Sequence, residues 1–146
     1  MDGTKAFDEF RIGDTATFTK TITETDIALF AGVSGDFYPL HVDAEYAKTT
    51  RFKQRAAHGM LTASLLSTVN GMLLQKPGGL FVSQTLRFLR PVFIGDTLTA
   101  RSEVIEILIE KRRMRCTTTI RNQAGKIVLD GEAMVQKDEI RAAGRN

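Results

Sequence analysis

One long apolar helix, followed only by strands, constrains most strongly how this chain can fold. Between residues 60 and 75 apolar side chains recur at steps of three and four, and small residues occupy one side of the predicted helix. A helix that is apolar over so much of its circumference is buried, and we expect Leu65, Val69 and Met72 on its core-facing side. After it, the residue pattern predicts strands at 80–89, 97–110, 112–121 and 126–136. The sequence therefore predicts an α+β fold in which an antiparallel sheet wraps around the central helix.

The first part of the chain is predicted to hold a strand over 15–22 and two short helices. Thr23, with Asp26 three positions later, is typical of a helix start, because each side chain can bond the backbone N–H of the other residue. Asp43 is expected to cap the second short helix by accepting a backbone hydrogen bond. Both helices precede the central one.

A bend over residues 34–42 separates the two short helices. Gly35 permits backbone angles that other residues resist, and Pro39 disfavours a helix immediately before it. Asp36 and His41 lie five positions apart within this bend, which on a regular helix would place them roughly 140° apart. A bend can instead bring the carboxylate and the imidazole together around one small polar group, for which we expect a water molecule.

The chain has 146 residues, which fits a single domain over 1–146 with residues 137–146 as a frayed polar tail. The hydrophobic share of 42% and the charged share of 25% are those of an ordinary globular protein. Cys116 is the only cysteine, so no intramolecular disulfide forms, and a reducing cytoplasm is expected. No apolar run has the length of a membrane span, and the N-terminus lacks the apolar core of a signal peptide.

The net charge of +3 is mild and favours an anionic small molecule over a nucleic acid. The sequence contains no zinc-finger spacing, no RNA-binding aromatic signature and no glycine-rich phosphate loop. We therefore expect neither a nucleic acid nor a membrane as partner.

Three ordered segments resemble the MaoC-like, (R)-specific enoyl-CoA hydratases. Residues 30–43 (FAGVSGDFYPLHVD) resemble the hydratase-2 motif of that family, and residues 57–61 (AHGML) and 88–96 (FLRPVFIGD) continue the match. The resemblance implies a hot-dog fold, in which a long helix is wrapped by an antiparallel sheet. It also implies a homodimer, or a higher assembly built on one, with the ligand site at the subunit interface.

The resemblance further implies roles for individual residues. Asp36 and His41 fall on the catalytic pair, and Gly59 falls on the glycine whose backbone N–H binds the thioester oxygen. Ser67 falls on a helix serine near the active site. Tyr38 stands where the family usually has Asn, so either the loop or the substrate pocket differs here, and we count Tyr38 among the substrate-binding candidates.

These residues suit the hydration of a 2-enoyl thioester, which needs an activated water at C3, a proton for C2 and stabilisation of negative charge on the thioester oxygen. Asp36 and His41 can hold the water and move the proton, although the sequence does not assign which is acid and which is base. The Gly59 N–H suits the third task, because the first turn of a helix leaves backbone donors unpaired and favours negative charge. The reverse reaction dehydrates a 3-hydroxyacyl thioester. The resemblance implies that the coenzyme A thioester is the substrate, and no cofactor or metal is expected.

A basic loop follows the second short helix and contains Arg51, Lys53 and Arg55. Such a cluster is often only a solvated surface loop. Its functional interpretation is a binding site for the phosphates of coenzyme A, for which Arg and Lys are suited. We include the three residues among the substrate-binding candidates.

Three other interpretations are open. His41, Asp43 and His58 have the spacing of a facial triad for non-haem iron, but that triad usually sits on an all-β fold, and we expect His58 to position the start of the helix. A hot-dog acyl-CoA thioesterase usually carries a catalytic carboxylate on or near the central helix, whereas residues 60–75 contain no Asp or Glu. A non-catalytic acyl-CoA-binding protein is the third, and Tyr38 favours it.

Overall fold

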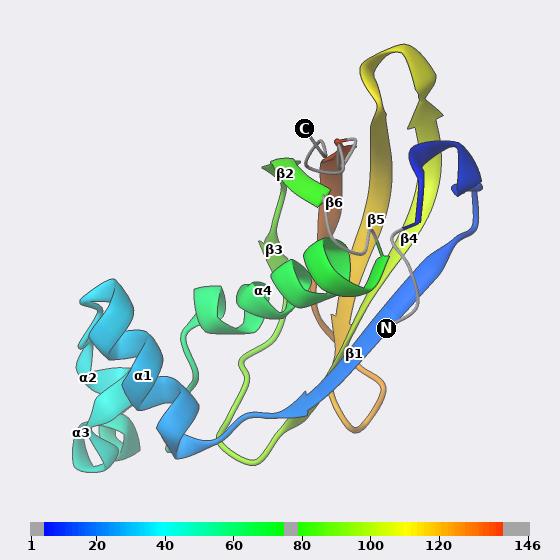
Figure 1. Cartoon of the computed structure of the whole chain (residues 1–146). Helices are drawn as coiled ribbons and strands as arrows, with labels where there is room; N and C mark the ends of the chain where they lie inside the picture. The colour runs from blue at the N-terminus through cyan, green and yellow to red at the C-terminus, as the bar shows by residue number, and fades with distance from the viewer. Residues whose placement is uncertain (1–4, 75–78, 139–146) are drawn as a thin grey trace.

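The computed structural model describes residues 5–74 and 79–138. Within them the chain forms one antiparallel sheet in the order β1-β4-β5-β6-β2, and the short strand β3 also pairs with β6. The helix α4 (Gly59–Ser67) lies across one face of this sheet (Figure 1). The predicted α+β architecture is thus confirmed. The strands are β1 (Thr15–Thr21), β2 (Gly79–Gln84), β3 (Arg87–Phe88), β4 (Thr97–Leu108), β5 (Arg113–Arg121) and β6 (Ile127–Lys137).

Three shorter helices form a group beyond the end of β1, away from the strands (Figure 1). Thr23 Oγ1 accepts a hydrogen bond from Asp26 N, and Asp26 Oδ2 accepts one from Thr23 N. Asp43 Oδ1 accepts from Tyr46 N. Both predicted caps are confirmed. The helices are α1 (Glu24–Ser34), α2 (Pro39–Val42) and α3 (Ala44–Thr49), and the single 3-10 turns are η1 (Phe7–Glu9) and η3 (Ile109–Lys111). No helix within the described ranges is long and apolar enough to cross a membrane.

The core lies between the central helix and the sheet. Alternate residues of β5 are buried, as expected for a strand with one face on a core. Burial of each leucine or isoleucine side chain stabilises the fold by about 1.5–3 kcal/mol. The cluster that joins helix and sheet includes Leu61, Leu65, Leu66, Val69, Leu98, Ala100, Ile120 and Leu129.

The central helix changes its hydrogen bonding half-way along. α4 ends at Ser67 and continues as the π-helix η2 (Thr68–Leu74), in which residue i bonds residue i+5 and the turn is wider. The prediction of one regular helix over 60–75 was therefore wrong in its second half. Leu65 and Val69 are buried as predicted, but Met72, which lies in the π-helix, is 68% exposed, so its predicted place on the core-facing side was wrong. Residue 75 lies outside the described residues.

The predicted strand over 80–89 is two strands, β2 and β3, with a break at Thr85. At Gly131 on β6, an added Cβ would lie 1.9 Å from the Thr85 carbonyl oxygen. The backbone at Thr85 therefore approaches β6 so closely that only glycine fits opposite it. This close approach coincides with the break in the strand.

The C-terminal boundary also differs from the prediction of a tail starting at residue 137. Lys137 is the last residue of β6 and is buried. Its N–H donates to the Arg112 carbonyl at 3.0 Å, and burial lowers the pKa of its ammonium group. The rest of the predicted tail, 139–146, lies outside the described residues.

The two edges of the sheet have different chemistry. β1 exposes its threonines at alternate positions, and two of them, Thr19 and Thr21, share hydroxyl hydrogen bonds with threonines of β4. β2 exposes three consecutive large apolar side chains, Leu80, Phe81 and Val82. One edge is thus polar and the other apolar.

Candidate active site

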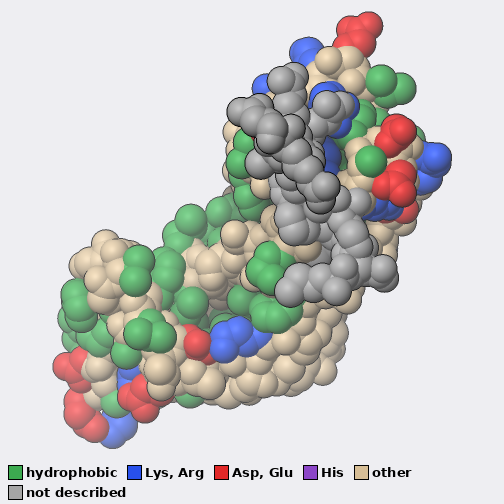
Figure 2. Space-filling view, viewed as in Figure 1, with side chains coloured by type: hydrophobic (Ala, Val, Ile, Leu, Met, Phe, Trp, Pro, Cys, Tyr) green, Lys and Arg blue, Asp and Glu red, His purple; other side chains and the backbone are tan. Residues whose placement is uncertain are grey.

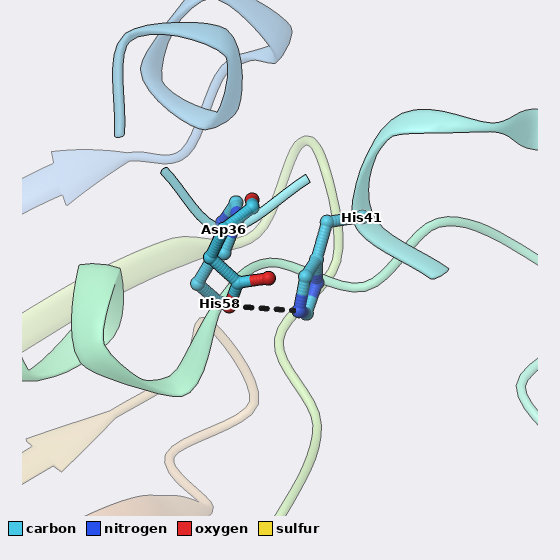
Figure 3. Close-up of side chains that lie close together, drawn as sticks. All are labelled: Asp36, His41 and His58. Atoms are coloured by element: carbon cyan, nitrogen blue, oxygen red, sulfur yellow. Dashed lines mark hydrogen bonds and ion pairs between the residues drawn. The ribbon is translucent and has the colours of Figure 1, made fainter. Parts of the chain in front are cut away.

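The loop between α1 and α2 carries Asp36, and α2 carries His41. Gly35 ends α1 in the left-handed conformation (φ 78°), and its N–H donates to the Ala31 carbonyl. Pro39 occupies the first turn of α2, where the helix needs no N–H from it. Asp36 Oδ2 and His41 Nε2 point toward one another at a distance of 4.0 Å (Figure 3). The predicted bend over 34–42 is confirmed only in its first half, because residues 35–38 form a turn whereas 39–42 form the helix α2, which was not predicted. The turn brings the carboxylate and the imidazole together.

The two oxygens of Asp36 have different surroundings. Oδ1 accepts a hydrogen bond from Tyr38 N at 3.1 Å, which shapes the loop as an Asx turn. Oδ2 faces His41 at 4.0 Å, beyond direct hydrogen-bonding distance. One water oxygen beside them, roughly 2.8 Å from each atom, can bond both. Asp36 therefore combines a structural contact with a free oxygen that can act on a ligand.

The hydrogen bond at Nδ1 fixes the orientation and the tautomer of His41. Nδ1 lies 2.7 Å from the Ala56 carbonyl oxygen, and because a carbonyl only accepts, Nδ1 carries the proton. In the neutral ring Nε2 then holds a lone pair. This lone pair lies on the side of Asp36 Oδ2.

The second histidine of the chain stacks on the first. The ring centroids of His58 and His41 are 3.9 Å apart, with 27° between the planes. His58 Nε2 donates to the backbone carbonyl of Asp36 at 2.9 Å, while its buried Nδ1 has no hydrogen-bond partner among residues 5–74 and 79–138. This pattern fits a neutral ring protonated at Nε2. His58 thereby ties the Asp36 loop to the start of α4 and supports the His41 ring.

Ligand atoms of Asp36, His41 and His58 all lie within 4.8 Å of one another. A metal ion would have to lie in the plane of each imidazole, along the lone pair of its nitrogen. Two rings stacked at 3.9 Å cannot both direct lone pairs at one ion. Asp43, the third member of the facial-triad interpretation, instead caps α3. The observed geometry does not suit a metal centre.

Gly59 is the first residue of α4, so its N–H has no partner within the helix. An added Cβ would lie 2.9 Å from Phe88 Cε1, so the aromatic ring occupies the space of a side chain. The helix dipole favours negative charge at this end. Asp36, His41 and Gly59 thus share one cavity. It has a volume of about 310 Å³ and is lined by Phe30, Ser34, Asp36, His41, His58, Gly59, Met60 and Phe88.

An apolar groove of about 520 Å³ adjoins this cavity, and the two share Phe30 and Met60. Ser67, the last residue of α4, lines the groove and not the cavity that contains Asp36 and His41. β2 forms the opposite wall through residues 81–84. Hydrophobic side chains gather between the short helices and the sheet in Figure 2.

Tyr38 lies beside His41 and outside the residues that line the cavity. Its ring stands edge-on to His41, with centroids 5.7 Å apart. Its hydroxyl lies 3.5 Å from that of Tyr46, and this hydrogen bond raises the pKa of the Tyr46 phenol. The two tyrosines form one exposed aromatic pair next to His41. The position of Tyr46 beside the site could not be predicted from the sequence, because the contact depends on the turn between α2 and α3.

The three basic candidates have different environments. Arg51 lies over the Phe52 ring at 4.8 Å. Lys53 is exposed and has a positive φ of 60°. Arg55 points inward, where Nε donates to the His41 carbonyl at 2.7 Å and Nη1 pairs with Glu24. Arg55 therefore holds α2 in place, and its contact with a phosphate stays a prediction.

The model of the MaoC like domain matches residues 9–126, and this range is more than half of the chain. The chain belongs to the MaoC-like family. An (R)-specific enoyl-CoA hydratase of Rhodospirillum rubrum is 48% identical over 129 residues, covering 88% of this chain and 89% of that protein. A 3-hydroxybutyryl-CoA dehydratase of Methylorubrum extorquens is 41% identical over 132 residues, and the match covers 89% of this chain and 82% of that protein.

The R-hydratase PhaJ1 of Pseudomonas aeruginosa, solved in the unliganded form, matches this MaoC-like chain with a TM-score of 0.87. The two are 46% identical, and the match covers 96% of this chain and 92% of that one. The resemblance on which the hot-dog fold was predicted is therefore confirmed, and so is the fold.

The MaoC-like site also contains groups that the sequence analysis did not assign to it. Phe88 lies within the matched segment 88–96, yet its contact with Gly59 depends on how β3 meets the helix start. The Ala56 carbonyl is a backbone group, so no residue type indicated it. Position in the fold, and not residue identity, makes these groups part of the site.

Proposed function

We propose that this MaoC-like protein is an (R)-specific enoyl-CoA hydratase. It adds water to a trans-2-enoyl-CoA to give the (R)-3-hydroxyacyl-CoA, and it catalyses the reverse dehydration. The observation that carries this proposal is the single cavity shared by the Asp36–His41 pair and the Gly59 N–H. The names of the related hydratase and dehydratase support it. The absence of Asp and Glu from residues 59–74 of the sequence disfavours the thioesterase alternative.

In the proposed mechanism one water molecule bridges Asp36 Oδ2 and His41 Nε2. His41 Nε2 removes a proton from this water, because Nδ1 already donates to the Ala56 carbonyl. The hydroxide oxygen bonds to C3 of the enoyl group, and the electron pair moves toward the thioester oxygen. The His41 Nε2–H then gives its proton to C2 on the same face. Asp36 orients the water and stabilises the imidazolium.

The N-terminus of α4 stabilises the enolate that forms between these two steps. The Gly59 N–H donates to the thioester oxygen, and the helix dipole adds to the effect. One such donor contributes about 2.7–4 kcal/mol of transition-state stabilisation in other enzymes. Because glycine has no side chain, the thioester can approach this N–H closely.

We propose that neither a metal nor a cofactor takes part. Two features of the site support this. The stacked His41 and His58 rings are wrongly oriented for a shared ion, and the substrate itself supplies the electron-accepting carbonyl. Activity that survives prolonged incubation with a chelator is the expected result.

We propose a second copy of the chain as partner, paired through β2. This strand is at an edge of the sheet and exposes Leu80, Phe81 and Val82, and such an edge offers unpaired backbone groups to another strand. The apolar groove between α4 and β2 lies beside this edge. A second copy would cover the groove, which then holds the acyl chain next to the catalytic cavity. We also propose a cytoplasmic location, which suits the free thiol of Cys116.

The decisive experiment supplies purified protein with crotonyl-CoA and with a longer enoyl-CoA. Loss of the conjugated enoyl absorbance reports hydration, and a thiol reagent separately reports hydrolysis. Double-bond loss without thiol release, with an (R)-configured product, is the expected result. Thiol release alone would identify a thioesterase, and neither signal would identify a binding protein.

Two variants test the assigned residues. His41→Ala removes the base and should lower kcat by about 10²–10⁴-fold. Asp36→Asn keeps an oxygen for Tyr38 N but loses the charge that supports the imidazolium, so it should also lower kcat strongly. Asp43→Asn, which keeps a capping side chain for α3, is the matched control and should retain activity. Full activity in both site variants would exclude this mechanism.

A further inference from the structure

The helix that carries His41 has little packing of its own. α2 consists of four residues, none of which is buried. So short a helix is not stable by itself, and in proteins it is normally the packing of apolar side chains that stabilises one. The last four carbonyl groups of a helix also lack partners within it, and in α2 these include the carbonyl of His41. The position of His41 therefore depends on polar contacts from outside α2.

Two consecutive residues of the basic loop provide these contacts. Arg55 Nε donates to the His41 carbonyl at 2.7 Å. The Ala56 carbonyl accepts a hydrogen bond from His41 Nδ1 at 2.7 Å, and Ala56 N donates to the Leu40 carbonyl at 3.3 Å. Residues 55 and 56 thus hold both the backbone and the imidazole of His41.

The backbone that follows Arg55 is itself fixed to the segment before β4. Ala56 forms an antiparallel bridge with Phe93, and Ala57 N donates to the Val92 carbonyl at 2.7 Å. Ala56 and Ala57 are both buried. Because this backbone is held on two sides, its hydrogen bonds define where His41 lies.

The other end of the Arg55 side chain contacts α1. Nη1 donates to Glu24 Oε1, and the side chain of Arg55 is only 15% exposed. A guanidinium carries its donors in a rigid planar fork, so one group can bond two acceptors in fixed directions. Glu24 is the first residue of α1, and Asp36 follows shortly after the last. One side chain therefore connects the helix that precedes Asp36 with the helix that carries His41.

We propose that Arg55 is a positioning residue for His41, and that Glu24 acts on His41 through Arg55. This inference rests on the proposed function, in which His41 is the base. Arg55 does not line the cavity that contains Asp36 and His41, so its effect on the reaction passes through the position of the imidazole. A displacement of about 1 Å at a reacting group can lower a rate by about 10²-fold. This role of Arg55 needs no contact with coenzyme A.

The first test compares two thioesters that share the reacting group. The crotonyl thioester of N-acetylcysteamine lacks the phosphates that crotonyl-CoA carries. Arg55→Gln should lower kcat by about 10²-fold for both, with little change in KM. Arg55→Lys keeps the charge but not the fork, so it should restore part of kcat. A rise in KM for crotonyl-CoA alone, with kcat unchanged, would instead make Arg55 a phosphate ligand and overturn the inference.

The second test separates Glu24 from Arg55. Glu24 is 71% exposed, and exposed ion pairs are weak, so Glu24→Ala should lower kcat only about two- to fivefold. The double variant Glu24→Ala/Arg55→Gln should have the kcat of Arg55→Gln, because the two residues act in series. Losses that multiply would show that Glu24 acts independently of Arg55. Lys48→Gln is the matched control, since Lys48 forms an exposed ion pair with Glu45 on α3, and it should change neither kcat nor KM.

Imidazole nitrogen NMR at pH 8 tests the positioning without any substrate. In the original protein His41 should carry its proton on Nδ1 alone, whereas Arg55→Gln should give a mixture of both tautomers. His58→Gln assigns the signals of the second ring. Suppose that the protein hydrates neither thioester, but that the tautomer of His41 changes in Arg55→Gln and not in Lys48→Gln. The positioning role then stands and the hydratase proposal falls.

The opposite result is equally clear. If hydration proceeds and Arg55→Gln keeps both the kcat of the folded protein and the single tautomer of His41, the hydratase proposal stands and the positioning role is wrong. A lower thermal midpoint in that variant would then show that Arg55 stabilises the fold and nothing more.

Discussion

The imidazole of His58 stacks on that of His41 at 3.9 Å and donates a hydrogen bond to the backbone of Asp36. One buried side chain therefore contacts both members of the proposed catalytic pair. His58 contacts the ring face of His41 and the backbone carbonyl of Asp36, and not His41 Nε2 or Asp36 Oδ2, the atoms that would bind the water. His58 also precedes Gly59, so the same residue connects the pair to the helix start that would bind the thioester oxygen. We infer that His58 positions three groups at once.

Substitution of His58 separates its two contacts. His58→Phe keeps an aromatic ring against His41 but leaves the Asp36 carbonyl without its donor, which should destabilise the protein by about 1–3 kcal/mol. We expect kcat to fall while KM changes little, because the substrate contacts remain. Steady-state kinetics and chemical denaturation measure the two effects.

His58→Gln is the complementary variant, since its amide can donate to Asp36 but cannot stack as an imidazole does. If only the stacking matters, His58→Phe keeps full kcat and His58→Gln loses it. A purely structural role would lower stability in both variants and leave kcat of the folded fraction intact.

The contact between Gly59 and Phe88 gives a second prediction. In Gly59→Ala the new Cβ would lie 2.9 Å from the Phe88 ring, so the ring must move or the helix start must shift. We expect kcat/KM to fall by about 10²-fold or more, as for loss of an oxyanion donor. Activity assays at saturating and limiting substrate show whether kcat carries the loss.

The double variant Gly59→Ala/Phe88→Leu supplies the control. A smaller side chain at position 88 leaves room for the added methyl group, so part of the lost activity should return. Equal activity of the single and double variants would show that the clash is not the cause.

The apolar edge of the sheet gives a third prediction. Phe81→Lys places a charge on β2 where we propose that a second copy pairs, and it should shift the protein from dimer to monomer. Light scattering after size-exclusion chromatography measures the mass. Ile109→Lys is the matched control, because Ile109 is a more exposed apolar residue on η3, far from β2 in the chain. A Phe81→Lys variant that remains dimeric would place the interface elsewhere.

Cys116 gives a prediction on pH. Burial raises the pKa of this thiol from 9.0 to about 11, although a hydrogen bond with Ser102 opposes the shift. The folded protein therefore keeps the thiol neutral over a range in which the unfolded chain ionises. The associated stability is fully present below pH 9 and is lost as the pH rises toward 11.

Guanidinium unfolding at pH 8 and at pH 10.5 measures this dependence. The free energy of unfolding should fall less with pH in Cys116→Ala than in the original chain. An equal fall of the free energy of unfolding in the two proteins would contradict a raised pKa for Cys116. The folded protein should also react slowly with thiol reagents at pH 8, so that Cys116 gives little background in the assay for released coenzyme A.

Local rules predicted the elements that local chemistry determines. Thr23 and Asp43 cap their helices because capping depends on residues within three positions. The convergence of Asp36 and His41 followed from Gly35, which ends α1, and from Pro39, which begins α2, because the two residues prevent one continuous helix. These predictions needed no knowledge of the sheet.

Contacts between distant segments could not be predicted in the same way. Arg55 looked like a surface cation, but it pairs with Glu24, 31 positions away. The π-helix after Ser67 differs from an α-helix by one residue in its hydrogen bonding, and that shift carries no residue signature in 60–75.

The unequal edges of the sheet limit the size of the assembly that we propose. A pair formed through β2 on a two-fold axis uses the apolar edge of both copies, so that surface cannot recruit a third. The outer edges of the joined sheet are then the β1 strands, whose exposed side chains are mainly threonine hydroxyls that water solvates. In the proposed pairing, sheet extension would therefore stop after one step, and the assembly would be a closed particle in place of a growing fibre.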